Sequence, residues 1–153
     1  MSKIERKAYD AVLALLLGML STLCFAQRQL SDVECPQPRF TGKAPDQYYG
    51  RVNPLQANSE NLAAGERLYL GQPRAQSCAV CHGAKGEGNG PLSLQFTPRP
   101  RNFACRQTIN GIPDGQLFWI VRFGSPDTAM PDHPGLSEEQ TWQLVLHLRR
   151  LAQ

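Results

Sequence analysis

The sequence predicts a small all-α domain, and three observations lead to this fold class. Three stretches of the 153-residue chain place apolar side chains at the spacing of one helical face. No stretch shows the sustained alternation of apolar and polar residues that marks a half-buried strand. The 12 proline and 13 glycine residues indicate short helices joined by long loops. With 41% hydrophobic and 19% charged residues, the composition suits one soluble globular domain.

The first helix is expected from about residue 59, where the Ser59 side chain can cap free backbone amides. Gly65 and Tyr69 then fall on one face, together with two leucines. Because a glycine costs about 1 kcal/mol relative to alanine inside a helix, we expect Gly65 to allow the close approach of another helix. We expect that helix to bring Trp142 against Gly65 and Tyr69.

The second and third helices have clearer boundaries. The second is expected from about Asp114, which follows Pro113, to a stop at Gly124. The third opens on a capping box, in which the side chains of Ser137 and Gln140 each satisfy a free backbone amide. His147 lies among arginines on this last helix, so we expect it at the surface.

The first 26 residues are typical of an export signal. A basic start precedes an apolar run over residues 11–26, which is short for a membrane span of about 20 residues. The run ends on Cys24, Phe25 and Ala26, a small-x-small cleavage site. We therefore expect residues 1–26 to be removed as a signal peptide, the alternative being an uncleaved anchor. The expected location is the periplasm, with membrane association only if the segment stays uncleaved.

Residues 27–58 are expected to form an N-terminal extension, and residues 59–153 the folded domain. Prolines interrupt any helical period in the extension, but its aromatic residues suit a segment that lies against the domain or a partner. In an oxidising compartment Cys35 of this extension could form a disulfide with Cys105, the alternative being two unpaired thiols. Closing such a loop would stabilise the fold by about 4 kcal/mol.

The most specific motif in the chain places Cys78, Cys81 and His82 in the order Cys-x-x-Cys-His. This spacing is the attachment signature of a c-type haem. Two thiols three positions apart on a helical turn can each bond one vinyl group of the porphyrin, and the adjacent imidazole can bind the iron. A zinc half-site and a thioredoxin-like dithiol are the alternatives. No second Cys-x-x-Cys and no strand–helix pattern accompany the motif, so we favour one covalently attached haem c.

Met130 is the predicted second iron ligand, because it is the only methionine after the expected cleavage site. It lies in a proline- and glycine-containing loop, and a thioether raises the potential of haem iron relative to two imidazoles. His133, three residues later, is the alternative ligand and would give bis-imidazole ligation. The glycine-rich run of residues 83–91 suits a close-turning loop around the edge of a flat cofactor.

Together these motifs resemble a class I c-type cytochrome, and especially the bacterial single-haem domains found as oxidase- or dehydrogenase-associated subunits. The resemblance covers about residues 59–151 and rests on residues 78–82, Gly90, Pro91, residues 98–103, residues 128–131 and the helix with Trp142. It implies an all-α fold in which the N- and C-terminal helices cross. It also implies that a backbone carbonyl accepts the His82 Nδ1 proton, and we expect that of Pro91. Arg99 or Arg101 is a candidate to pair with a haem propionate, the alternative being arginines that face solvent.

The resulting functional prediction is a single-electron carrier that serves redox protein partners and is not itself an enzyme. The extension could instead dock the domain permanently onto a larger periplasmic oxidoreductase. In a third hypothesis Met130 is displaced and the haem binds gases or catalyses a reaction, which would need a polar distal group such as His133. The net charge of +3 is too small to indicate nucleic acid as a partner.

Overall fold

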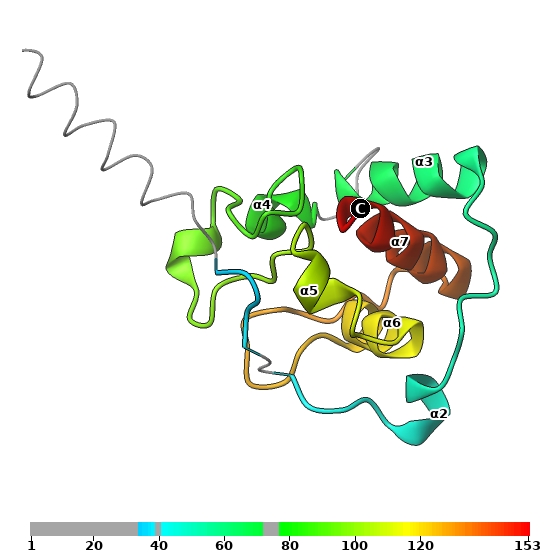
Figure 1. Ribbon diagram of the computed structural model, residues 1–153, viewed down its shortest axis with the longest axis horizontal. Coiled ribbons are helices and arrows are strands. Elements are labelled where there is room, and N and C mark those ends of the chain that lie inside the picture. The colour runs from blue at the N-terminus through cyan, green and yellow to red at the C-terminus, as the bar shows by residue number, and fades with distance from the viewer. Residues whose placement is uncertain (1–33, 39–40, 72–76) are drawn as a thin grey trace, which may run out of the picture. The chain divides into compact units, whose positions relative to one another are not determined.

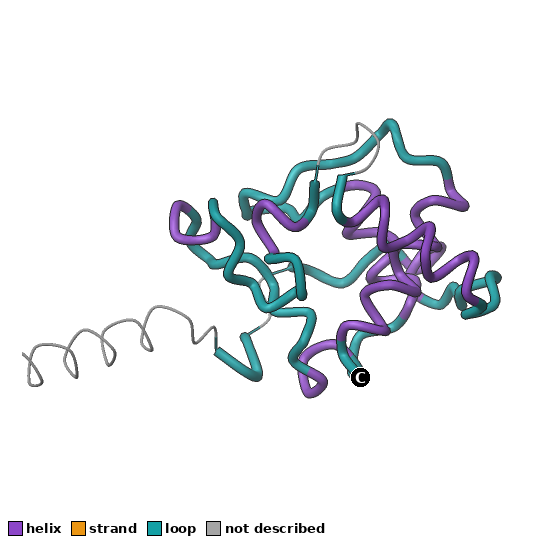
Figure 2. The backbone as a smooth tube through the Cα atoms, turned by 90° about the horizontal axis from the view of Figure 1, so that it is seen from above, coloured by secondary structure: helices purple, strands orange, loops and turns teal. Residues whose placement is uncertain are grey.

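The computed structural model describes residues 34–38, 41–71 and 77–153, so the predicted signal segment lies outside the described residues. The described residues form α2 (Asp46–Tyr49), α3 (Ser59–Tyr69), α4 (Ala79–His82), the 3₁₀ turn η1 (Ser93–Gln95), α5 (Arg106–Ile109), α6 (Asp114–Phe123) and α7 (Glu138–Leu151). Figure 2 shows helices joined by long loops, with no strand in these ranges. The predicted all-α class is therefore confirmed. None of the described helices has the length and apolar character needed to cross a membrane.

The two longest helices, α3 and α7, pack against each other (Figure 1). The residue that caps α3 lies one position before the predicted Ser59. Asn58 precedes the helix and its side chain accepts from the Asn61 backbone N–H at 2.9 Å, whereas Ser59 is the first helical residue. The capping box predicted for α7 is present, with Ser137 and Gln140 each accepting from the other's backbone N–H.

Gly65 lies where α3 closely approaches α7, but its predicted partner was wrong. A Cβ atom at Gly65 would lie 2.1 Å from the backbone oxygen of Gln143 and 3.0 Å from the Cβ atom of His147. The Tyr69 ring packs on the ring of His147, with 4.9 Å between centroids. Trp142 is buried against α6 instead. Glycine is needed here because the neighbour is backbone, which cannot move aside as a flexible side chain can.

Replacing Gly65 with Ala is expected to destabilise the fold by about 1–3 kcal/mol, the usual cost of overpacking a tight contact. Urea unfolding of the purified protein measures the change. Gly111→Ala is the matched control, because no atom lies within 4 Å of the Cβ position of Gly111. Equal losses of stability in the two variants would contradict a close approach at Gly65.

His147 is buried between α3 and α7, which corrects the predicted surface position. Its side chain is 2% exposed. Nδ1 accepts from Arg150 Nη2 at 3.4 Å, and the buried Nε2 has no hydrogen-bond partner among the described residues. Burial, reinforced by the nearby Arg150 charge, lowers the pKa of His147 from 6.5 to about 4.

Acidification is therefore expected to destabilise the fold through His147. Its folded pKa of about 4 lies below its ordinary value of 6.5, so between these pH values only the unfolded chain binds this proton. The contribution of the neutral His147 side chain to the free energy of unfolding is fully present above pH 6.5. It is lost as the pH falls between these two pKa values, by up to ~1.4 kcal/mol per pH unit. Unfolding at pH 7 and pH 5 should show a smaller loss for His147→Gln than for the wild type. Equal losses of stability in the wild type and the variant would contradict this role of His147.

A second apolar cluster joins α6 to α7. The rings of Phe118 and Trp142 lie 4.3 Å apart between centroids, and Leu117 and Val145 pack beside them. As predicted, α6 ends at Gly124, whose positive φ of 77° is one that glycine adopts without strain. The chain turns there into the loop that leads to α7.

The described part of the predicted extension lies against α6 and α7. A Cβ atom at Gly115 in α6 would lie 1.8 Å from the backbone oxygen of Tyr48 in α2. The backbone N–H of Ala44 donates to Gln116 Oε1 at 2.8 Å. The guanidinium of Arg51 lies over the rings of Phe118 in α6 and Trp142 in α7, 4.8 and 5.2 Å from their centroids. This segment is thus packed onto the domain by backbone, polar and aromatic contacts.

The structure also contains the predicted disulfide between Cys35 and Cys105, whose Cα atoms lie 5.7 Å apart. Cys35 is exposed, whereas Cys105 is buried at the start of α5. The bond ties the extension to the loop before α5. It also removes Cys105 from the thiolates that a zinc site could recruit. Within the described ranges, no three His, Cys, Asp or Glu side chains gather into a group that could hold a metal ion.

Candidate functional site

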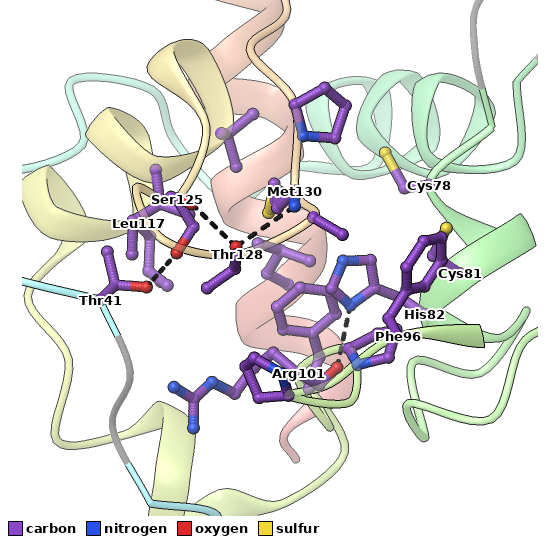
Figure 3. A pocket seen from close by; sticks show the side chains of 18 of the residues that line it. Thr41, Cys78, Cys81, His82, Phe96, Arg101, Leu117, Ser125, Thr128 and Met130 are labelled. Atoms are coloured by element: carbon purple, nitrogen blue, oxygen red, sulfur yellow. Dashed lines mark hydrogen bonds between the residues drawn. The ribbon is translucent and has the colours of Figure 1, made fainter. Parts of the chain in front are cut away.

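A mainly apolar pocket brings the predicted ligand motifs together. Cys78, Cys81, His82 and Met130 all line it, although α4 and the loop after α6 are far apart in the sequence. Figure 3 shows the motif residues and Met130 extending into the same space. The apolar side chains around them include Phe96, Phe103, Leu117, Ile120, Val121 and Leu148.

The single turn of α4 positions the two thiols. The backbone N–H of His82 donates to the Cys78 carbonyl at 2.9 Å, so residues 78 and 82 stand one helical turn apart. Both Cys78 and Cys81 are free and partly buried. Burial raises the pKa of Cys78 to about 11 and also raises the pKa of Cys81. Both are therefore neutral thiols near pH 7, unlike the low-pKa thiolate of a redox dithiol.

The imidazole of His82 has one ring nitrogen engaged and the other available. Nδ1 lies 2.9 Å from the Arg101 carbonyl oxygen, the dashed line beside Arg101 in Figure 3. Because a carbonyl only accepts, Nδ1 carries the proton and Nε2 keeps a lone pair. Burial lowers the pKa of His82 to about 4, so the ring is neutral. This is the tautomer that a metal-binding histidine requires. The prediction that the Pro91 carbonyl is the acceptor was wrong, because the Arg101 carbonyl takes that place.

Met130 is held at the pocket by a short loop that closes on itself. Its backbone oxygen accepts from the Ser125 N–H at 3.2 Å, and its own N–H donates to Thr128 Oγ1 at 3.2 Å. The Thr128 hydroxyl donates to the Ser125 carbonyl at 2.8 Å. Gly124 packs against the same loop, since a Cβ atom there would lie 2.8 Å from the Met130 oxygen. These contacts fix the backbone that presents the thioether.

His133 also lines the pocket, so the loop supplies both predicted candidates for a second ligand. Its backbone N–H donates to the Arg122 carbonyl at 3.1 Å. Burial lowers the pKa of the His133 imidazole, which favours its neutral form.

None of the glycine-rich residues 83–91 lines this pocket, and their predicted place at the edge of a cofactor stays a prediction. A Cβ atom at Gly90 would lie 2.5 Å from the Val80 oxygen in α4, and Gly86 packs against α7. The Gly86 carbonyl accepts from the Phe103 backbone N–H at 2.6 Å. The glycines therefore let this loop pass tightly against two helices and support Phe103, whose ring stacks on His82 with 4.4 Å between centroids.

Sequence reasoning missed two pocket residues from the extension, Gln37 and Thr41. The Thr41 and Ser125 hydroxyls form a hydrogen bond, which joins the extension to the methionine loop. Arg101, a predicted propionate partner, directs one guanidinium nitrogen to the carbonyls of Gln37 and Pro38 at 3.3 and 3.2 Å. Only the pairing proposed for Cys35 and Cys105 had indicated that the extension approaches this region.

Comparisons with known proteins agree with this fold. The family model for cytochrome c matches residues 62–152 of the chain. Among solved structures, the chain is similar to one from the reducing HAO-like protein complex of Kuenenia stuttgartiensis, with a TM-score of 0.56 and 24% sequence identity. That similarity covers 65% of this chain and 47% of the other, so it extends over less than half of the neighbour. A search of curated protein sequences found no match.

Proposed function

Because this chain belongs to the cytochrome c family, we propose that it carries one electron at a time between redox proteins through a haem with histidine and methionine ligands. The observation that carries the proposal is one pocket containing two free thiols, a neutral imidazole with an available lone pair, and a thioether. These donors fit a covalently attached haem c. When bound, the haem supplies reversible one-electron exchange at its iron.

Each of these residues has a distinct part in the proposed site. Cys78 and Cys81 would hold the haem through two thioether bonds. His82 Nε2 and the Met130 sulfur would be the ligands of its iron. The Arg101 carbonyl fixes the ring orientation of His82 and increases the electron donation of its free nitrogen. The mainly apolar side chains of the pocket would limit the access of water to the bound haem.

Met130 is favoured over His133 as the second ligand for a chemical reason. A methionine thioether has no N–H group, so it can bind iron without a hydrogen-bond acceptor nearby. A ligating histidine, in contrast, normally donates its other ring N–H to an acceptor. Among the residues that the structure describes, nothing accepts a hydrogen bond from the His133 ring. The backbone of Met130 is fixed on both sides by Ser125 and Thr128.

We also propose that the protein works after export to the periplasm, with residues 1–26 as a signal peptide or an uncleaved anchor. The disulfide between Cys35 and Cys105 supports this proposal, because such bonds persist in oxidising compartments. Haem attachment through free thiols is compatible with the same location.

Permanent docking on a larger oxidoreductase is the second candidate. It is favoured by the structural neighbour, which belongs to a multi-subunit HAO-like protein complex. The described extension packs on its own domain, so a docked partner would meet the face of the extension that stays exposed, or another surface of the domain. Size-exclusion chromatography of the native protein from its own cells separates the two cases, since a carrier elutes alone and a subunit elutes with its enzyme.

Ligand-binding experiments test the proposed function. Because Met130 completes the iron coordination, the reduced native protein should not bind carbon monoxide and the oxidised protein should bind cyanide only slowly. Absorption spectra of both forms, before and after ligand addition, measure this. Rapid binding would show an open iron and would support the catalytic or gas-binding alternative.

A further inference from the structure

The carbonyl that orients His82 is itself held by the extension. Gln37 Nε2 donates to the Pro100 carbonyl at 3.2 Å, and Gln37 Oε1 accepts from the Asn102 backbone N–H at 2.6 Å. One side chain thus binds the peptide groups on both sides of Arg101. This contact comes from a residue 65 positions away in the sequence.

The second of these hydrogen bonds acts on the peptide unit that contains the His82 acceptor. The Asn102 N–H and the Arg101 carbonyl belong to one planar peptide group, so fixing the direction of the N–H also fixes the direction of the C=O. A continuous hydrogen-bonded path therefore runs from Gln37 Oε1 through this peptide to His82 Nδ1. Hydrogen bonds in such a chain polarise one another, which makes the carbonyl a stronger acceptor.

Gln37 is in turn held in place from several directions. Its backbone N–H donates to Thr108 Oγ1 at 3.2 Å, and its carbonyl accepts from Arg101 Nη1 at 3.3 Å. Two residues earlier, the bond between Cys35 and Cys105 attaches the segment covalently to the domain. These contacts fix the main chain that carries the Gln37 side chain.

We propose that Gln37 is a positioning residue, which orients the Arg101–Asn102 peptide toward His82 and thereby sets the electron donation of His82 to the iron. This inference rests on the proposed function. A strong acceptor at Nδ1 makes the imidazole a better donor, which stabilises ferric iron. Without Gln37 the Arg101 carbonyl becomes a weaker acceptor for His82. The equilibrium between ferric and ferrous iron then shifts toward the ferrous, reduced protein.

The experiment measures the midpoint potential of the haem-loaded full chain and two variants. In Gln37→Met the length of the side chain is kept but both hydrogen bonds are lost. The ratio of reduced to oxidised protein at a fixed potential should rise roughly tenfold, the usual scale for losing a hydrogen-bond partner of a metal-binding histidine. This change corresponds to a rise of about 59 mV in the midpoint potential for one electron. Gln37→Glu keeps an acceptor for the Asn102 N–H and adds negative charge, so its ratio should stay at or below that of the wild type.

Asn53→Ala is the matched control within the same segment. Asn53 Nδ2 donates to the Trp142 carbonyl at 3.0 Å, away from the His82 acceptor. Its loss should lower the unfolding temperature without changing the midpoint potential. A shift of potential in Asn53→Ala as large as that in Gln37→Met would overturn the specific role of Gln37.

NMR of the reduced wild-type protein gives a measurement that does not depend on the folding of a variant. The Asn102 amide and the His82 Nδ1 proton should both exchange slowly with solvent, because each is hydrogen-bonded. Fast exchange of the Asn102 amide, or an unchanged potential in a well-folded Gln37→Met, would overturn the inference and leave the proposed function intact. Wild-type protein without bound haem would instead contradict the proposed function.

Discussion

Replacing Met130 with Ala is expected to lower the reduction potential and to open the iron to external ligands. A thioether favours ferrous iron, so its loss removes a preference for the reduced state. The expected change is a fall of at least roughly tenfold in the ratio of reduced to oxidised protein at a fixed potential, or about 59 mV. Redox titration measures it, and carbon monoxide should then bind the reduced variant.

His133→Gln is the control for this experiment, because His133 lines the same pocket and is the alternative ligand. If Met130 binds the iron, His133→Gln should keep the absorption spectrum of the oxidised wild type. An unchanged spectrum in Met130→Ala, together with an altered one in His133→Gln, would transfer the ligand role to His133.

Removing the disulfide is expected to cause a large loss of stability. In the variant Cys35→Ala/Cys105→Ala, the unfolded chain regains the freedom of a loop spanning 70 residues. The chain-entropy model gives a loss of about 4 kcal/mol in the free energy of unfolding. Denaturant unfolding of the haem-loaded protein measures it. The expected outcome also includes a raised midpoint potential, because the segment that carries Gln37 is then less firmly held.

A stability within about 1 kcal/mol of the wild type would show that noncovalent contacts alone hold the extension. Arg51→Ala provides the comparison, because it removes a cation–π contact to the α6 and α7 rings and leaves the disulfide intact. Its expected cost is smaller, about 1–2 kcal/mol. A larger loss in the free energy of unfolding for Arg51→Ala than for Cys35→Ala/Cys105→Ala would contradict this prediction.

The features that the sequence predicted correctly depend on short spacings. The single turn of α4 brings Cys78, Cys81 and His82 together because the motif fits one helical turn. The start of α7 was likewise predictable from Ser137 and Gln140, since a capping box involves only neighbouring residues. The ligand role of Met130 stays a prediction, made because few other side chains could serve, but the structure does place Met130 at the same pocket as the motif.

The features that the sequence did not predict depend on rotation, backbone atoms or long-range packing. Successive residues of a helix point about 100° apart, so the rotation of α7 about its own axis decides whether Trp142 or Gln143 meets Gly65. The acceptor for His82 is a backbone carbonyl, which every residue possesses and which therefore leaves no signal in residue type. The role of Gln37 was hidden for a related reason, because its partners are peptide groups more than sixty positions away.

The proton NMR spectrum of the reduced protein, purified from its own cells, tests the His82 and Met130 ligation of a bound haem most directly. If the Met130 sulfur binds the iron, its methyl group lies over the porphyrin ring, and its signal should move far upfield of any ordinary methionine methyl. A Met130 methyl signal at its ordinary position in the haem-loaded protein would contradict the proposed ligation.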